Sequence, residues 1–188
     1  WCLFICSNLI NLVPGMEKEQ QLEFWLRGPL PGITPVLQPV AHAILQAQIE
    51  VQQALAHFPA ARLWDKPSGS ASVAFHLQHL AGVLDRLFTY ARKEQLSPLQ
   101  LNALQKEGKE DNSIHLTDLL QIFNNQVESA IGQLKNTTEA SLHETRGVGR
   151  KQIPSNVLGL LFHAADHTQR HTGQLLVTAK VVGSMQTK

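Results

Sequence analysis

The stretch NVLGLLFHAADHTQRHTGQLLVTAKVV, residues 156–182, has the pattern of one long amphipathic helix. Six of its positions recur at spacings of three and four residues, as on a helix face that packs against other helices: Leu160, Ala164, His167, His171, Leu175 and Thr178. Ser155, which follows Pro154, is a suitable N-cap, and Gly183 suits the C-terminal end. The sequence therefore predicts a packed helix that carries histidines on its buried face.

Three further long segments have helical periodicity and are bounded by helix-breaking or capping residues. They are residues 40–58, closed by Pro59; residues 71–93, capped by Ser70 or Ser72; and residues 113–134. A shorter helix is expected at residues 99–107, after Ser97 and Pro98. No segment shows convincing strand alternation. Helices joined by polar loops predict an all-α four-helix bundle, and the long connection between its second and third helices favours a crossover.

The overall charge argues against a nucleic-acid surface. The formal net charge is +1 and no cluster of Lys and Arg stands out, whereas binding to phosphates needs several grouped cations. The chain is long enough, and at 43% hydrophobic residues apolar enough, for one domain with a sizeable core. Cys2 and Cys6 form neither a disulfide framework nor a thiolate metal site. We expect a cytoplasmic protein of one domain, without a nucleic-acid partner.

Residues 1–15, WCLFICSNLINLVPG, are apolar but lack the basic start of a signal peptide. Their apolar run is far shorter than the ~20 residues that a membrane-spanning helix needs. Met16 then opens a polar stretch, MEKEQQ. We interpret residues 1–28 as an N-terminal extension peripheral to the fold and residues 29–188 as the bundle domain, with no membrane partner. A short membrane-associating or signal-like segment is the rival interpretation of residues 1–15.

The arrangement of histidines is the unusual feature of this chain. Five of the nine fall in two short segments: His76 and His79, then His163, His167 and His171. At about 100° per residue, a step of four along a helix turns only about 40°, so the last three imidazoles share one face. Two histidines at such a spacing can bind one ion, as in HExxH zinc helices. A third ligand from a facing helix would leave a coordination position open for water or substrate.

Spacing leaves the composition of such a site open. Either His76 or His79 could supply the third ligand, and His163 could replace His171. Because buried imidazoles need a polar partner, histidine-mediated polar packing accounts for the pattern as well as a metal ion does. Gly82 lies close to His79 along the helix, and its missing side chain could leave room for an ion.

The two histidine segments, FHLQHLAGVLDRL and HAADHTQRHTGQLL, resemble those of the DinB-like (YfiT-like) superfamily of four-helix-bundle metalloproteins. The resemblance covers residues 36–182. It implies a bundle with a long crossover, a homodimer, and a divalent metal ion, zinc or nickel, bound by His79, His167 and His171. His76 and His163 remain the alternative ligands. The chain has Arg170-His171-Thr172-Gly173-Gln174 where the family commonly ends in HHRGQ, which weakens any transfer of substrate but keeps the ligand spacing.

The resemblance also implies a function, because some members of this superfamily are thiol-dependent transferases. We expect a metal-dependent thiol S-transferase or hydrolase that acts on a small electrophilic substrate, with a low-molecular-weight thiol as partner. The alternative is a non-catalytic, metal-stabilised binding or stress-response module, so whether the protein is an enzyme stays open. Asp166, Arg170 and Arg86 could support the ligands or bind substrate, although a solvated surface or a salt bridge between helices explains them better. Glu50 could reach the ion, or belong to a polar helix face.

Overall fold

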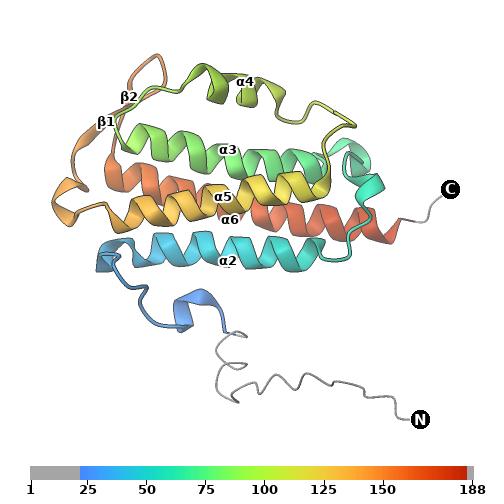
Figure 1. The fold of residues 1–188 in the computed structure, drawn as a ribbon, viewed down its shortest axis with the longest axis horizontal. Coiled ribbons are helices and arrows are strands. Elements are labelled where there is room, and N and C mark those ends of the chain that lie inside the picture. The colour runs from blue at the N-terminus through green and yellow to red at the C-terminus, as the bar shows by residue number, and fades with distance from the viewer. Residues whose placement is uncertain (1–21, 186–188) are drawn as a thin grey trace, which may run out of the picture.

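The computed structural model describes residues 22–185, and within them the predicted helices are present. Their bounds are α2 (Gln38–Leu55), α3 (Val73–Ala91), α4 (Pro98–Lys106), α5 (Leu116–Lys135) and α6 (Val157–Ser184). The four long helices lie side by side as a bundle, and the short α4 lies outside it (Figure 1). The predicted all-α bundle is therefore confirmed.

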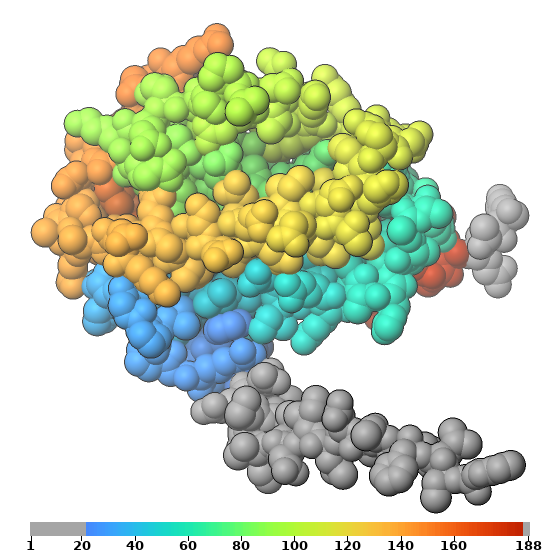
Figure 2. Space-filling view, in the orientation of Figure 1, coloured from blue at the N-terminus to red at the C-terminus, as the bar shows by residue number. Residues whose placement is uncertain are grey.

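The order of the helices in space confirms the predicted crossover. The helix α3 packs against α5 and α6, and α2 packs against the same two helices from the other side. Since α3 and α5 run in the same direction, the chain between them has to return along the bundle, and α4 is part of that return (Figure 1). In the space-filling view α4 lies along one edge of the molecule, beside α3 (Figure 2).

The core is formed by one apolar face from each long helix. The largest completely buried side chains include Ile44 of α2, Leu77 of α3, Phe123 of α5 and Leu161 of α6. On α6, the apolar members of the predicted face are buried, whereas His167 and His171 between them are only half-buried. The histidine row therefore lies where the core meets the surface, which allows access from solvent.

A short hairpin precedes α6, where the sequence analysis expected only a polar linker. Its strands β1 (Thr145–Val148) and β2 (Ile153–Asn156) pair antiparallel, and Gly149 lies in the turn with a φ of +65°. Four-residue strands with few apolar side chains leave no alternation to detect. The hairpin also contacts the C-terminal end of α3, where Nε of Arg146 donates a hydrogen bond to the Ala91 carbonyl oxygen at 2.7 Å.

The helix starts follow capping chemistry. Ser72 caps α3 by accepting a hydrogen bond from the Phe75 amide, and Ser97 opens α4 in a capping box with Gln100. The predicted cap of α6 was wrong by one residue: the side chain of Asn156, not Ser155, accepts from the Gly159 amide at 2.7 Å. Asn is as good a cap as Ser, so local preference alone did not separate the two.

The N-terminal boundary at residues 28 and 29 stays a prediction, and the interpretation of residues 1–15 lies outside the described residues. A 3-10 turn at Phe24–Leu26 lies against α2, where the Phe24 amide donates to Oε1 of Gln46 at 3.0 Å. Among the described helices, none combines the length and apolarity required to cross a membrane.

Candidate metal centre

Packing of α3 against α6 brings three of the predicted imidazoles together. Nε2 of His79 lies 2.9 Å from Nε2 of His167. The ring of His171 lies 4.3 Å from that of His79 and 4.7 Å from that of His167, between centroids. One nitrogen from each of the three rings lies within 4.8 Å of the other two. His79, His167 and His171 are therefore close enough to hold one metal ion.

The donor set fits a transition-metal ion. Two nitrogens bound at ~2.0–2.1 Å to one ion are about 2.9–3.4 Å apart for bond angles near 90–110°, and the His79–His167 distance falls in this range. Imidazole suits zinc, nickel, copper and iron, whereas calcium and magnesium prefer oxygen. Three protein ligands also leave at least one coordination position free for a water or a substrate.

The surroundings keep these imidazoles in the form that binds metal. Burial, followed by the charges of His79, His167 and His76, lowers the pKa of His171 to about 4. Burial and the charge of His79 also lower the pKa of His167. At neutral pH both rings are therefore uncharged, and a neutral imidazole has the lone pair that a metal ion needs.

His79 has a carboxylate partner that the sequence analysis missed. Its Nδ1 lies 2.8 Å from Oε2 of Glu107, at the C-terminal end of α4, and Nη1 of Arg86 lies 2.5 Å from the other oxygen. Burial by itself would raise the pKa of the Glu107 carboxyl, but the hydrogen bonds and charges of His79 and Arg86 lower it below its usual value. An ionised carboxylate only accepts hydrogen bonds. In the neutral ring, Nδ1 of His79 is therefore the protonated nitrogen, and Nε2 has the free lone pair.

Nothing local in the sequence singles out Glu107. It is 28 residues from His79 and stands among charged residues in KEGKED. The carboxylate considered in its place, Glu50, accepts a hydrogen bond from Nε2 of Gln46 at 2.9 Å on α2. Only the return of the crossover along α3 brings Glu107 to the site.

The two alternative ligands occupy different positions. His76 is buried, and its Nδ1 lies 3.3 Å from Nδ1 of His171. It therefore contacts that ligand from the buried side. Burial and then the charge of His79 lower the pKa of His76 to about 4. His163 is exposed, with its ring centroid 5.4 Å from that of His167. Neither belongs to the group of three nitrogens described above.

The unused nitrogen of His167 distinguishes this ligand from the other two. Its Nδ1 is buried and has no hydrogen-bond partner among the described residues. A hydrogen bond from Nε2–H of His167 to Nε2 of His79 would leave Nδ1 as an unpaired acceptor. A metal ion on Nε2 would instead leave Nδ1 as an unpaired donor. In either state this ring is held by packing and by its Nε2 alone.

The charged residues expected near the ligands separate into two groups. Arg86 is largely buried, binds Glu107 and so belongs to the support of His79. Asp166 and Arg170 form an exposed ion pair with each other, one turn apart on α6, at 2.8 Å. The expected space for an ion at Gly82 is wrong: the side-chain tips of Arg86 and Glu107 fill it.

A cavity of about 260 Å³ lies beside His167. Most of its lining is apolar or aromatic, and the rest is one arginine and two histidines: Val83, Leu87, Tyr90, Leu96, Leu104, Arg86, His163 and His167. A small, partly apolar molecule could therefore lie against one edge of the imidazole cluster.

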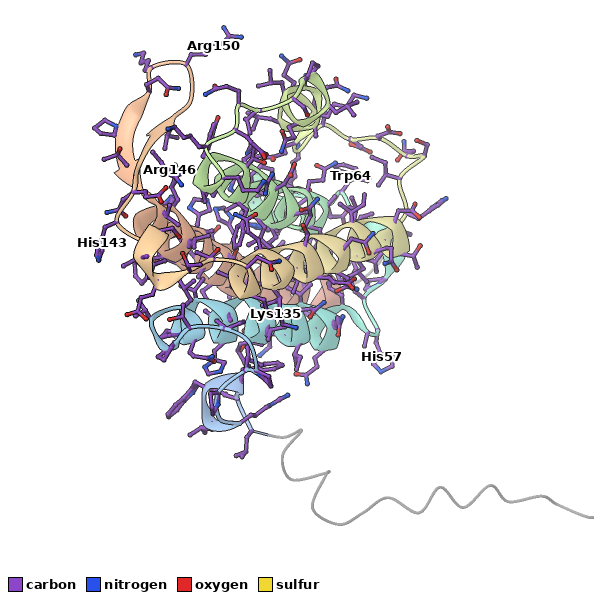
Figure 3. The ribbon with its side chains drawn as sticks, turned by 60° about the vertical axis from the view of Figure 1, so that its left-hand side comes forward. His57, Trp64, Lys135, His143, Arg146 and Arg150 are labelled. Carbon is purple, nitrogen blue, oxygen red and sulfur yellow. The ribbon has the colours of Figure 1, made fainter. Side chains whose placement is uncertain are left out.

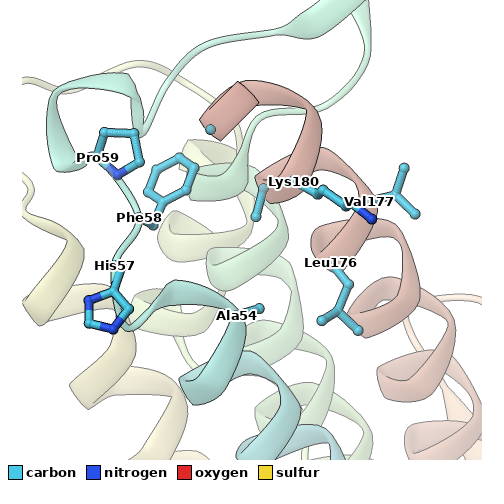
Figure 4. Close-up of a pocket in the computed structure, with 9 residues that line it drawn as sticks. Ala54, His57, Phe58, Pro59, Leu176, Val177 and Lys180 are labelled. Carbon is cyan, nitrogen blue, oxygen red and sulfur yellow. The ribbon is translucent and has the colours of Figure 1, made fainter. Parts of the chain in front are cut away.

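One further cavity and two further histidines lie away from the cluster. A cavity of about 550 Å³ at the end of the bundle is lined by His57 and Phe58 after α2 and by Val177 and Lys180 of α6 (Figure 4). None of the three clustered histidines lines it. His57 and His143 are exposed at opposite ends of the bundle (Figure 3).

The comparison with protein families agrees with this geometry. The model described as the DinB superfamily matches residues 21–175, a range that contains all three clustered histidines. A search of the curated proteins finds no match to this sequence.

Proposed function

This chain belongs to the DinB superfamily, and on that premise we propose that it binds one divalent metal ion through His79, His167 and His171. The observation that carries the proposal is the convergence of three imidazole nitrogens from two helices within 4.8 Å of one another. Zinc or nickel, the metals that the family resemblance implies, both suit this all-nitrogen donor set.

We further propose that the site is catalytic and acts as a thiol S-transferase or hydrolase. A bound zinc or nickel ion would supply Lewis acidity, which lowers the pKa of a thiol or a water. A low-molecular-weight thiol would lose its proton to solvent, and its sulfur would form a bond to an electrophilic carbon while the leaving group departs with its electron pair. For a hydrolase, water replaces the thiol.

The cavity beside His167 supports a small electrophilic substrate. Its apolar lining, with Val83 and Leu87 on α3 and Leu104 on α4, would exclude water from the apolar part of such a molecule. Tyr90 and His163, whose side chains carry polar groups, line the same cavity. A homodimer and a cytoplasmic location remain predictions.

A non-catalytic, metal-stabilised binding or stress-response module is the alternative. It is favoured by the ion pair between Asp166 and Arg170, which are engaged with each other rather than with the ligands. Such a module would lose stability on metal removal but would turn over no substrate.

Elemental analysis of the purified protein tests metal binding directly. We expect about one equivalent of zinc or nickel per chain, which the His167→Ala variant lacks. A chain without stoichiometric metal after growth with both metals, and after reconstitution, would refute the site.

A test of catalysis gives the metal-loaded protein glutathione and an aryl halide. Turnover of the aryl halide by the wild type but not by His167→Ala supports the transferase. If the wild type turns over neither the aryl halide nor ester substrates, the binding module is supported.

A further inference from the structure

Resting on the proposed metal site, we infer that Glu107 is a positioning residue that fixes the metal-binding form of His79 and thereby couples the docking of α4 to metal binding. Glu107 does not reach the group of three nitrogens itself. It acts through Nδ1 of His79, at 2.8 Å, on the side of the ring opposite the nitrogen that faces His167.

The carboxylate holds the ring of His79 in one orientation and one tautomer. Because the carboxylate accepts a hydrogen bond from Nδ1–H, the neutral ring has its lone pair on Nε2, and the negative charge makes Nε2 a stronger electron-pair donor to a metal ion. Phe75 stacks on the same ring, with centroids 5.2 Å apart and planes 13° from parallel. The ring is thus fixed before any metal binds, which removes part of the entropy cost of binding.

Glu107 is itself held in place from α3. Nη1 of Arg86 binds its second oxygen at 2.5 Å, and the side chains of both residues are only about a tenth exposed. The tips of both fill the space where a side chain at Gly82 would lie. The next residue, Gly108, has a φ of +73° and donates its amide to Oε1 of Gln78 at 2.8 Å. Contacts from Gln78, next to His79, and from Arg86, two turns further along α3, therefore fix the end of the crossover.

These contacts matter because α4 has little else to hold it. No residue of α4 is completely buried. Its start is tied to α3 by Gln100, whose Nε2 donates to Asp85 and to Thr89, and its end by Glu107. If a docked Glu107 strengthens metal binding by some factor, bound metal strengthens docking by the same factor. The crossover thus becomes more rigid when the site is loaded.

The first test compares zinc affinity in the wild type and in Glu107→Gln by competition with a chromogenic chelator. Removing the partner of a ligating histidine is expected to weaken binding by about 10–100-fold. The matched control is Glu110→Gln, an exposed carboxylate in the same loop, which should bind as the wild type does. An affinity in Glu107→Gln within about twofold of wild type would overturn the inference. A wild type that binds no zinc would instead refute the proposed metal site.

The second test reaches the same contact through a different residue. Gly82→Ala adds a methyl group where the tips of Arg86 and Glu107 lie, so it should displace the pair and weaken zinc binding about tenfold. Gly132→Ala on α5 meets no atom within 4 Å and should have no effect. The double variant with Gly82→Ala and Glu107→Gln should lose little more zinc affinity than either single variant. Additive losses would mean that the two changes act independently, against the inference.

Two readouts separate positioning from a general loss of structure. The ¹⁵N shifts of the His79 ring should report a protonated Nδ1 in the wild type and a mixture of tautomers in Glu107→Gln, while circular dichroism shows both folded. Hydrogen exchange of residues 98–106 should slow on adding zinc in the wild type and not in the variant. Equal exchange with and without zinc in the wild type would refute the coupling to α4.

Discussion

The three clustered imidazoles are supported unequally. On the α3 side, Nδ1 of His79 is hydrogen-bonded to the buried Glu107 carboxylate, which Arg86 binds in turn. On the α6 side, Nδ1 of His171 faces the neutral ring of His76 at 3.3 Å, and Nδ1 of His167 has no partner among the described residues. The two ligands on α6 therefore have fewer and weaker hydrogen-bonding partners than the one ligand on α3.

This difference shows that positioning and ligation come from different parts of the chain. A spacing of four residues places His167 and His171 on one face because helix geometry alone requires it. Orienting an imidazole takes a second group at hydrogen-bond distance from its other nitrogen, and helix geometry does not supply one. For His79 that group arrives with the crossover, and for His167 the structure provides none within the described residues.

The largest effect is expected from His167→Ala. Loss of one of three ligands should weaken zinc binding by more than about 100-fold, although this ring has the least support. His163→Ala removes an exposed imidazole one turn earlier and should leave the affinity unchanged. Isothermal titration of both variants measures the contrast. Loss of binding in His163→Ala with retention in His167→Ala would exchange the roles of the two residues.

Metal binding should stabilise the fold by a smaller but measurable amount. At free zinc about 100 times its dissociation constant, the free energy of unfolding should rise by about 2.7 kcal/mol. Chemical denaturation with and without zinc measures this difference, and a chelator should reverse it. His167→Ala should show no zinc-dependent difference. A variant stabilised as much as the wild type would mean that zinc binds elsewhere.

Replacing the support of His171 should have an intermediate effect. His76→Leu fills the buried position with an apolar side chain and removes the nitrogen that faces Nδ1 of His171. We expect zinc affinity to fall about tenfold, at the low end of such supporting contacts, because the lost partner is neutral. His57→Leu, at the far end of α2, is the matched control. A larger loss of zinc affinity than in Glu107→Gln would mean that His171 is supported more strongly than His79.

The smallest effect is expected from the exposed pair on α6. Asp166→Asn removes one charge of a pair whose side chains are 43% and 55% exposed, and such pairs one helical turn apart contribute only about 0.3–0.5 kcal/mol. The free energy of unfolding should fall by no more than that, and zinc affinity should be unchanged. A tenfold loss of affinity would instead place Asp166 in the support of His167.

The comparison also shows where prediction from sequence succeeds. The helices from Gln38 to Ser184 follow from apolar periodicity, prolines and caps, which are local signals. The hairpin at Thr145–Asn156 was missed because its strands are short and mostly polar, and the role of Arg146 in closing α3 depends on a contact 55 residues away. The space at Gly82 was misassigned because the side chains that fill it come from outside the local motif.

The sequence by itself determined that α6 presents His163, His167 and His171 on one face, because the helix repeat fixes that geometry without reference to the rest of the chain. Only the tertiary structure decided which of them meet a partner. The packing of α3 on α6 brings His79, rather than His76, into the group of three and places His76 behind His171. It also brings Glu107 to His79 through the crossover, because contacts between residues far apart in the chain depend on how helices pack and not on local spacing.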